Sequence, residues 1–376
     1  MKAYTPGLKV VASCRHRCRR QLPLSGEVLV GVGERVGAQT AVARTDLPGV
    51  VSPVNLAQAL GIEPSDVPQA LQVAIGGEVA AGQLLGRSAG FWGWFRRESF
   101  APVGGIVETV SRTTGQVMLR GPSRPLEVRA YLAGEVVEVL PAVGVVLEAP
   151  ATLVQGIFGV GGEAYGVLEL VGDRQTPTVE PTALTPDLRG KLVVVGGRVT
   201  AGLLRAAQDV GVSALVGGGI DDSDLRDFLG YDLGVATTGD EAVGLTLIVT
   251  EGFGDVTMAE RTWSLLMSRR GAEGACTGAT QIRAGVLRPE IVLPWPAGEE
   301  ARETSARHAA DLGELRVGAQ VRIIRDPYFG LIGEVRALPP APQLLASGAR
   351  ARVLEVAIPG RDPLVVPRAN VELIEG

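Results

Sequence analysis

The sequence has few lysines and few histidines, and these shortages limit the chemistry that the protein can perform. Of its 36 lysines and arginines only three are lysines, namely Lys2, Lys9 and Lys191. General acid–base catalysis most often uses histidine, and the chain has two, His16 and His308. Neither histidine has an evident nucleophile near it in the sequence. A hydrolase triad is therefore not expected, although an enzyme that uses carboxylates and arginines stays open.

Cysteines and long apolar runs are also scarce. Three cysteines are too few for a disulfide framework. No run approaches the ~20 apolar residues of a membrane span, and the N-terminus lacks the apolar core of a signal peptide. We therefore expect a cytoplasmic protein with no membrane span. The net charge of −5 argues against a globally basic nucleic-acid binder, although residues 1–20 carry six basic side chains and no acidic one.

Glycine is abundant, with 51 residues, which indicates many tight turns between short strands. The first half of the chain consists of valine-rich runs separated by such glycines. A proline-containing stretch with little apolar content follows and is typical of a linker. We predict a multidomain α+β protein with five parts: a β-rich region 1–172, a linker 173–187, an α/β domain 188–295, a connector 296–312 and a β-rich C-terminal domain 313–376.

Strands and helices alternate in the central part of the chain, which predicts an α/β domain with a mostly parallel sheet. Thr257 and Glu260 have the spacing of a capping box and predict the start of a helix that ends in arginines. The strands are expected at 191–197, 213–219 and 245–252, and the helices at 199–211, 221–230 and 257–270.

The most specific stretch is LRVGAQVRIIRDPYFGLIGEVRAL, residues 315–338. Apolar residues alternate along two predicted strands, and glycines lie where a tight turn must join them. With Gly318, Val321, Ile323, the Pro327-Tyr328-x-Gly330 turn, Gly333 and Val335, it closely resembles the KOW motif. That motif forms part of the small SH3-like barrels of NusG-type transcription factors and several large-subunit ribosomal proteins. The chain as a whole resembles bacterial KOW-containing proteins.

The resemblance implies a C-terminal SH3-like barrel that binds RNA, the ribosome, RNA polymerase or another protein module. The side chains that would contact such a partner are Arg316, Arg322, Arg325, Tyr328 and Arg336. A barrel of this kind can also serve as a structural end-cap or a protein-docking module, and the sequence leaves these alternatives open.

Residues 26–119 resemble the barrel-sandwich hybrid of biotinyl and lipoyl domains. The glycine and valine cadence of that fold recurs at 32–43 and 75–86, and residues 101–111 match one of its strands. Biotin or lipoate would be attached to a lysine, but no lysine occurs between Lys9 and Lys191. A swinging-arm carrier is therefore excluded, and no cofactor is expected.

Five aromatic residues gather within GFWGWFRRESF, residues 90–100. Trp92 and Trp94 are followed by Arg96 and Arg97, and tryptophan and arginine dominate binding hot spots and stack on nucleic-acid bases. This pattern predicts a tip that contacts a partner. A small local core beneath a long hairpin is the alternative.

Three features of the α/β domain are candidates for a ligand site. Gly196 and Gly197 lie between a strand and a helix, where backbone N–H groups can hold an anion, but they lack the spacing of a nucleotide-binding loop. Thr250, Glu251 and Asp255 lie at the end of a strand, the usual site edge of an α/β sheet. The aspartates at 221, 222 and 224 could hold Mg²⁺ but are also favoured at a helix start.

The octapeptide SCRHRCRR, residues 13–20, raises the question of a metal site. On a strand, Cys14 and Cys18 would be roughly 13 Å apart at ~3.3 Å per residue, too far for one zinc shell. No metal is therefore expected. Alternation predicts that Cys14, His16 and Cys18 face the core, and that an arginine ladder faces outward to pair with acids or to meet a polyanion. The ladder comprises Arg15, Arg17 and Arg19.

These patterns favour a non-catalytic adaptor or scaffold that binds RNA or a ribonucleoprotein, or another protein of such an assembly. The first alternative is an enzyme or small-ligand sensor that uses the strand ends of the α/β domain. The second is a self-assembling structural protein, and whether the chain forms a homo-oligomer stays open.

Overall fold

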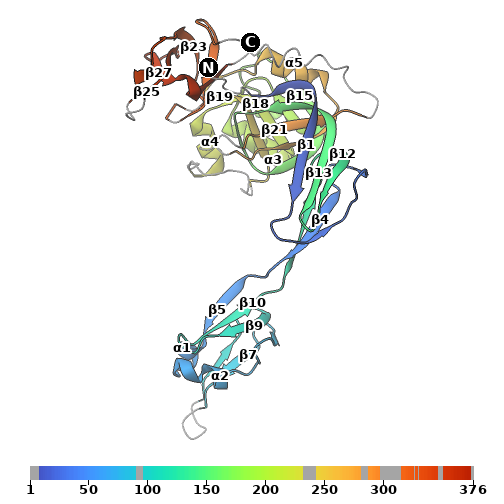
Figure 1. Ribbon diagram of the computed structural model, residues 1–376, viewed down its shortest axis with the longest axis vertical. Coiled ribbons are helices and arrows are strands. Elements are labelled where there is room, and N and C mark those ends of the chain that lie inside the picture. Colours follow the sequence, from blue (N-terminus) through green and yellow to red (C-terminus); the bar gives the residue numbers. More distant parts are fainter. Residues whose placement is uncertain are drawn as a thin grey trace.

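The computed structural model describes residues 8–89, 96–231, 243–280, 287–296, 315–325, 327–328, 330–345 and 350–373. It is strand-rich, with one large mixed sheet and several smaller ones, which confirms the multidomain α+β class. Figure 1 shows a body that contains most of the large sheet, an arm of long strands, and a distal domain at the far end of the arm. A C-terminal module lies against the body on the side away from the arm.

The large sheet runs through both the body and the arm. Its parallel centre is β15-β16-β18-β19, and β14, β20, β21, β13 and β12 extend it with antiparallel pairs. The strands are β1 (Val10–Gln21), β3 (Arg35–Val36), β12 (Gly134–Leu140), β13 (Gly144–Gln155), β14 (Phe158–Val160), β15 (Glu163–Val171), β16 (Leu192–Val195), β17 (Arg198–Val199), β18 (Ala214–Ile220), β19 (Thr246–Phe253), β20 (Glu273–Thr277) and β21 (Glu290–Pro294).

Helices cover both faces of the parallel centre. Alternate residues of a strand face opposite sides, so one set packs on α3 (Ala201–Val210) and α4 (Asp222–Leu229) and the other on α5 (Glu260–Ser268). α3 begins after the capping residue Thr200, close to the predicted start at 199, and ends at Gly211 as predicted. Among the described residues, no helix is long and apolar enough to cross a membrane.

The predicted capping box of α5 is wrong. The N-cap is Ala259, and the first turn receives no hydrogen bond from its own capping side chain. Thr257 lies two residues too early to cap the helix. The backbone N–H of Ala259 instead donates to Glu251 Oε1 (3.1 Å), which comes from the neighbouring strand β19.

Residues 173–187 pack on the body and do not behave as a free linker. Val179 and Leu184, together with the adjacent Leu188, are buried in the core beneath α3. Two short 3₁₀ helices, η2 (Pro181–Ala183) and η3 (Pro186–Leu188), hold them in place. The segment also does not separate two sheets, because β15 before it pairs with β16 after it. The sequence predicts a linker here because the segment is mostly polar and has only these few buried apolar residues.

The arm consists of β2 (Glu27–Val28), β3, β4 (Ala41–Leu47), β11 (Arg124–Arg129) and β12, with the far ends of β1 and β13. Strands β4 and β11 pair antiparallel and carry the chain out to the distal domain and back (Figure 1). Where the arm joins the distal domain, a Cβ on Gly49 would lie 1.9 Å from the carbonyl oxygen of Gly121. The two connecting segments can approach each other this closely only because position 49 has no side chain.

The distal domain has its own four-stranded sheet, in the order β5-β10-β9-β6, and its own apolar core. The two copies of the repeated glycine and valine cadence, at 32–43 and 75–86, belong to different parts of the fold. The first copy forms β3 and the start of β4 in the arm. The second copy forms β6 and β7 of this domain. Its elements are β5 (Val51–Asn55), α1 (Leu56–Leu60), η1 (Pro64–Asp66), α2 (Val67–Ala70), β6 (Glu78–Val79), β7 (Leu84–Arg87), β8 (Glu98–Phe100), β9 (Gly105–Val110) and β10 (Gln116–Arg120).

The C-terminal module is a five-stranded antiparallel sheet in the order β27-β26-β23-β22-β28. Val321, Ile323 and Val335 are buried in its core, which confirms the predicted alternation. Its elements are β22 (Gln320–Ile323), β23 (Ile332–Ala337), β24 (Gln343–Leu344), β25 (Arg350–Ala351), β26 (Val353–Ala357), β27 (Leu364–Pro367), η4 (Arg368–Asn370) and β28 (Val371–Leu373). Residues 297–314, which include most of the predicted connector and His308, lie outside the described residues.

Candidate functional site

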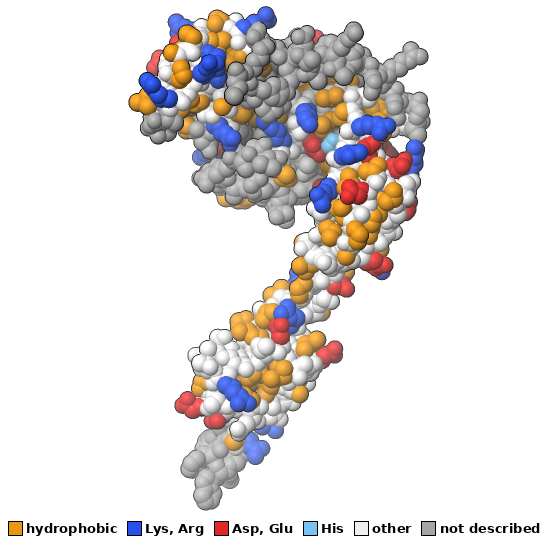
Figure 2. All heavy atoms as spheres, in the orientation of Figure 1, with side chains coloured by type: hydrophobic (Ala, Val, Ile, Leu, Met, Phe, Trp, Pro, Cys, Tyr) orange, Lys and Arg blue, Asp and Glu red, His pale blue; other side chains and the backbone are white. Residues whose placement is uncertain are grey.

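The arginine ladder of β1 is confirmed, and two of its members pair with one acid. Arg15 Nη1 and Arg17 Nε both donate to the carboxylate of Glu148, which lies on the adjacent strand β13. Both arginines keep the pKa of Glu148 below its usual value, and Arg17 has the larger effect. Figure 2 shows acidic and basic side chains intermixed on this face of the arm. Two of the three ladder arginines therefore pair within the chain, and the third, Arg19, is exposed.

The opposite face of β1 points inward, as predicted. Cys14 and Cys18 contact the apolar core of the arm, and burial raises the pKa of both thiols, that of Cys18 to about 11. Both thiols therefore stay protonated at neutral pH and are weak nucleophiles. Among the described residues, no group of three or more His, Cys, Asp or Glu side chains could hold a metal ion.

His16 faces a half-buried carboxyl group on another strand. Its Nε2 lies 3.7 Å from Oε1 of Glu290, the first residue of β21. Burial raises the pKa of Glu290 to about 7, although Lys9 and the Tyr131 hydroxyl oppose the shift. Burial, with a smaller effect of Lys9, lowers the pKa of His16. A carboxyl group that titrates near neutral pH is a frequent property of functional sites.

Arg20 extends this polar cluster toward the body. Its Nη1 and Nη2 donate to the two carboxylate oxygens of Glu163 (2.6 and 2.9 Å), and its guanidinium lies 5.5 Å from the ring centre of Tyr131. The Tyr165 hydroxyl donates to Glu163 Oε2 (2.9 Å), and burial raises its pKa. Sequence reasoning missed Arg20 as a site residue, although strict alternation already places it on the inward face with His16.

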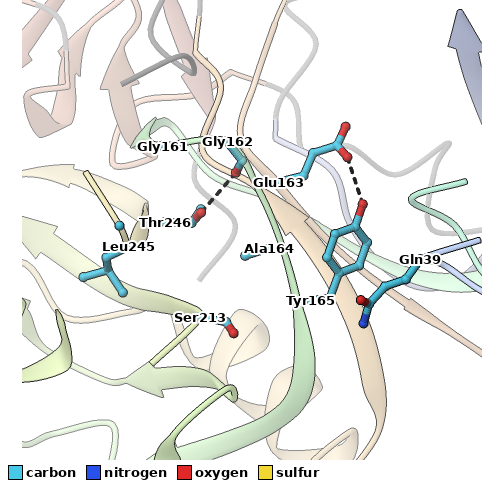
Figure 3. A pocket seen from close by; sticks show the side chains of 10 residues that line it. Gln39, Gly161, Gly162, Glu163, Ala164, Tyr165, Ser213, Leu245 and Thr246 are labelled. Atoms are coloured by element: carbon cyan, nitrogen blue, oxygen red, sulfur yellow. Dashed lines mark hydrogen bonds between the residues drawn. The ribbon is translucent and has the colours of Figure 1, made fainter. Parts of the chain in front are cut away.

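A pocket of about 470 Å³ opens beside Glu163 and Tyr165. It lies at the start of β15 and at the N-terminal ends of β18 and β19, and a turn of the arm borders it. Figure 3 shows Gln39 and Tyr165 on one side, Leu245, Thr246 and Ser213 on the other, and the hydrogen bonds from Tyr165 to Glu163 and from Thr246 to Gly162. The lining residues are Gln39, Gly161, Gly162, Glu163, Ala164, Tyr165, Ser213, Gly244, Leu245 and Thr246.

The predicted anion site at Gly196 and Gly197 is closed. A Cβ on Gly196 would lie 2.4 Å from Arg174 Cα, and one on Gly197 would lie 2.2 Å from the Thr176 oxygen. The carbonyl of Gly196 accepts from Met258 N. Both glycines thus serve a close approach of backbone segments, and the segment that sequence reasoning treats as a linker covers them.

The predicted strand-end site at Thr250 and Glu251 is also filled by protein. Thr250 is buried, and its hydroxyl donates to the carbonyl of Gly217 (3.2 Å). Glu251 is buried and accepts from Arg322 of the C-terminal module at Oε2 (2.9 Å). Asp255 is exposed nearby. This edge of the sheet is an interface between the body and the C-terminal module.

Arg322 is the centre of that interface and is not available to a partner. Its Nη1 donates to Glu372 Oε1 (2.7 Å) and its Nη2 to Glu251. The side chains of Arg322, Glu251 and Glu372 are 3%, 7% and 1% exposed. Arg288 adds a bond to Glu372 Oε2 (3.3 Å). Only the fold reveals this role, because these residues are far apart in the sequence.

The other predicted contact residues of the C-terminal module are at its surface. Arg316, Arg325 and Arg336 are exposed, and Tyr328 is half-buried against the core of the module. Arg336 approaches Glu355 at 3.8 Å. Figure 2 shows that basic side chains outnumber acidic ones on the visible face of this module.

The aromatic stretch and the aspartates complete the set of predicted site residues. Arg96 and Arg97 are exposed beside β8, whereas Trp92 and Trp94 lie outside the described residues. Asp221 pairs with Arg198, and Asp224 accepts from the first N–H of α3 (3.0 Å). These aspartates therefore have structural partners near the helix ends.

A scan against protein-family models and a search of curated proteins found no significant match to the chain.

Proposed function

We propose that the protein is a non-catalytic adaptor whose C-terminal module is of the KOW type and binds RNA or a ribonucleoprotein. The exposed arginines of this module, Arg316, Arg325 and Arg336, carry the proposal. Arginine grips phosphate groups with two parallel hydrogen bonds. Arg325 lies in the turn between β22 and β23, whereas Arg316 and Arg336 lie at the opposite end of this hairpin, which contains the residues that resemble the KOW motif.

The charge of the module supports the same function. Residues 315–376 hold eight arginines and six acidic residues, although the whole chain has a net charge of −5. Arg322 and Glu372 are buried together, so they do not contribute to the surface. The exposed surface therefore keeps an excess of positive charge, which attracts a polyanion locally without making the whole protein basic.

The shape of the chain supports an adaptor role. The C-terminal module and the distal domain lie at opposite ends of the long axis, with the body and arm between them (Figure 1). The distal domain exposes apolar side chains that are suited to a second contact. They include Val50, Val51, Ile75, Phe100, Val103 and Ile106. One end would hold the nucleic acid while the other holds a protein.

Charge reversal tests the RNA proposal better than removal of the module, because removal would expose Glu251 at the interface. The triple variant Arg316→Glu/Arg325→Glu/Arg336→Glu should bind labelled single-stranded RNA much more weakly than the wild type. Each phosphate contact contributes about 0.7 to the salt slope for single strands, so the slope should fall by about 2. Fluorescence anisotropy across a potassium chloride series measures both quantities.

The matched control reverses three exposed arginines outside the module, namely Arg35, Arg44 and Arg112. This variant has the same net charge as the test variant and should retain wild-type binding. An equal loss in both variants would mean that only overall charge matters, and the absence of salt-dependent binding by the wild type would exclude the RNA function. Light scattering on the same samples tests the alternative of self-assembly.

A further inference from the structure

The pocket beside Tyr165 lies outside the surfaces that the adaptor function uses. We propose that it binds a neutral, polyhydroxylated small molecule, a sugar unit of pyranose or furanose size. Its volume of about 470 Å³ lies within the range of small-ligand sites. Three of its lining residues are Gly161, Gly162 and Gly244, so much of the lining is backbone.

The charge of the lining selects a neutral ligand. No lysine, arginine or histidine is among the described residues that line the pocket, so a phosphate or carboxylate group would lack a cationic partner in that part of the lining. Glu163 is the one acidic residue of the lining, and the bidentate bond from Arg20 already neutralises it. A cationic ligand therefore gains little from this carboxylate.

The hydrogen-bonding groups of the lining suit hydroxyl groups. The Tyr165 hydroxyl donates to Glu163 and the Thr246 hydroxyl donates to the Gly162 carbonyl, so each oxygen keeps a lone pair to accept a further bond. The Gln39 amide can both donate and accept, and the Ser213 hydroxyl can do the same. A sugar hydroxyl needs one donor and one acceptor nearby, and both walls of the pocket supply them (Figure 3).

Tyr165 also supplies a flat apolar surface in a defined orientation. Its hydroxyl is held by Glu163, and its ring meets Tyr131 edge-on with ring centres 6.3 Å apart. Ligand sites commonly combine such an aromatic wall with a few placed polar groups. A purely apolar ligand would not satisfy the Gln39 amide or the Ser213 hydroxyl, which is costly.

Titration of the full-length protein with D-glucose, N-acetyl-D-glucosamine and D-ribose, followed by saturation-transfer NMR, tests the proposal. At least one of these sugars should bind saturably, with a dissociation constant of about 1 mM or tighter. Gln39→Ala, at an exposed position, should weaken this binding about tenfold, as expected for the loss of a hydrogen bond. Ser213→Ala, at the opposite wall, should act in the same direction.

The matched control is Gln58→Ala, an exposed glutamine of the distal domain, which should leave binding unchanged. Inorganic phosphate and putrescine serve as charged probes and should not compete with the sugar. The proposal is overturned if none of the three sugars saturates, if both pocket variants bind as the wild type does, or if a charged probe displaces the sugar.

Discussion

Arg322→Ala is expected to reduce the free energy of unfolding by about 3–5 kcal/mol, because it removes the arginine that the buried carboxylates of Glu251 and Glu372 share. Among the described residues, only the 3.3 Å ion pair from Arg288 to Glu372 then remains. The two carboxylates belong to different parts of the fold, β19 of the body and β28 of the C-terminal module. Their repulsion should also separate the module from the body. Urea denaturation followed by circular dichroism measures the loss, and limited proteolysis detects a detached module.

Arg336→Ala provides the matched control, since it removes an arginine of the same module whose side chain is 64% exposed. A surface pair of this kind contributes only about 0–1 kcal/mol. Adding Glu251→Gln and Glu372→Gln to an Arg322→Leu variant should restore most of the lost stability, because the two buried carboxylates lose their charge together with Arg322. Arg288, the other partner of Glu372, is 20% exposed and keeps contact with water. If the free energy of unfolding of Arg322→Ala lies within about 1 kcal/mol of the wild-type value, the ion network does not stabilise the contact between the module and the body.

Glu290→Gln is expected to stabilise the protein at pH 8 by up to about 3 kcal/mol and to leave it nearly unchanged at pH 4. Burial is the largest influence on this carboxyl group and raises its folded-state pKa from 4.5 to about 7. Lys9 and Tyr131 act in the opposite direction but do not cancel the shift. The folded state therefore binds the proton more tightly than the unfolded state. Wild-type stability falls as the pH rises through this window, and an amide at position 290 removes that loss.

The groups that face Glu290 are Lys9, His16 and Tyr131, with the thiols of Cys14 and Cys18 nearby. His16 titrates in the opposite sense, because its lowered pKa reduces stability as the pH falls below 6.5. Urea denaturation at half-unit pH intervals separates the two residues, with His16→Gln as the comparison. Parallel stability curves for Glu290→Gln and the wild type would show that this carboxyl group is not strained by burial.

Local patterns were sufficient for the elements that depend on neighbouring residues. The helix at 201–210 has its capping threonine and terminal glycine within the same short stretch. The faces of β1 follow from the alternation of a strand, and the buried valines of β22 and β23 follow from the same rule. Such features depend on residues a few positions apart, so composition and spacing determine them directly.

Contacts between distant segments decided the rest. Val179 and Leu184 convert an expected linker into part of the core, and Arg322 leaves the surface because β19 supplies Glu251. The pocket combines a turn of the arm with the starts of three strands of the body. No local pattern encodes these meetings, because they depend on which strands pair and which faces pack. The sequence thus determined the approximate positions of most elements and which face is apolar, whereas the packing of those faces decided which polar groups are buried, paired or open to a ligand.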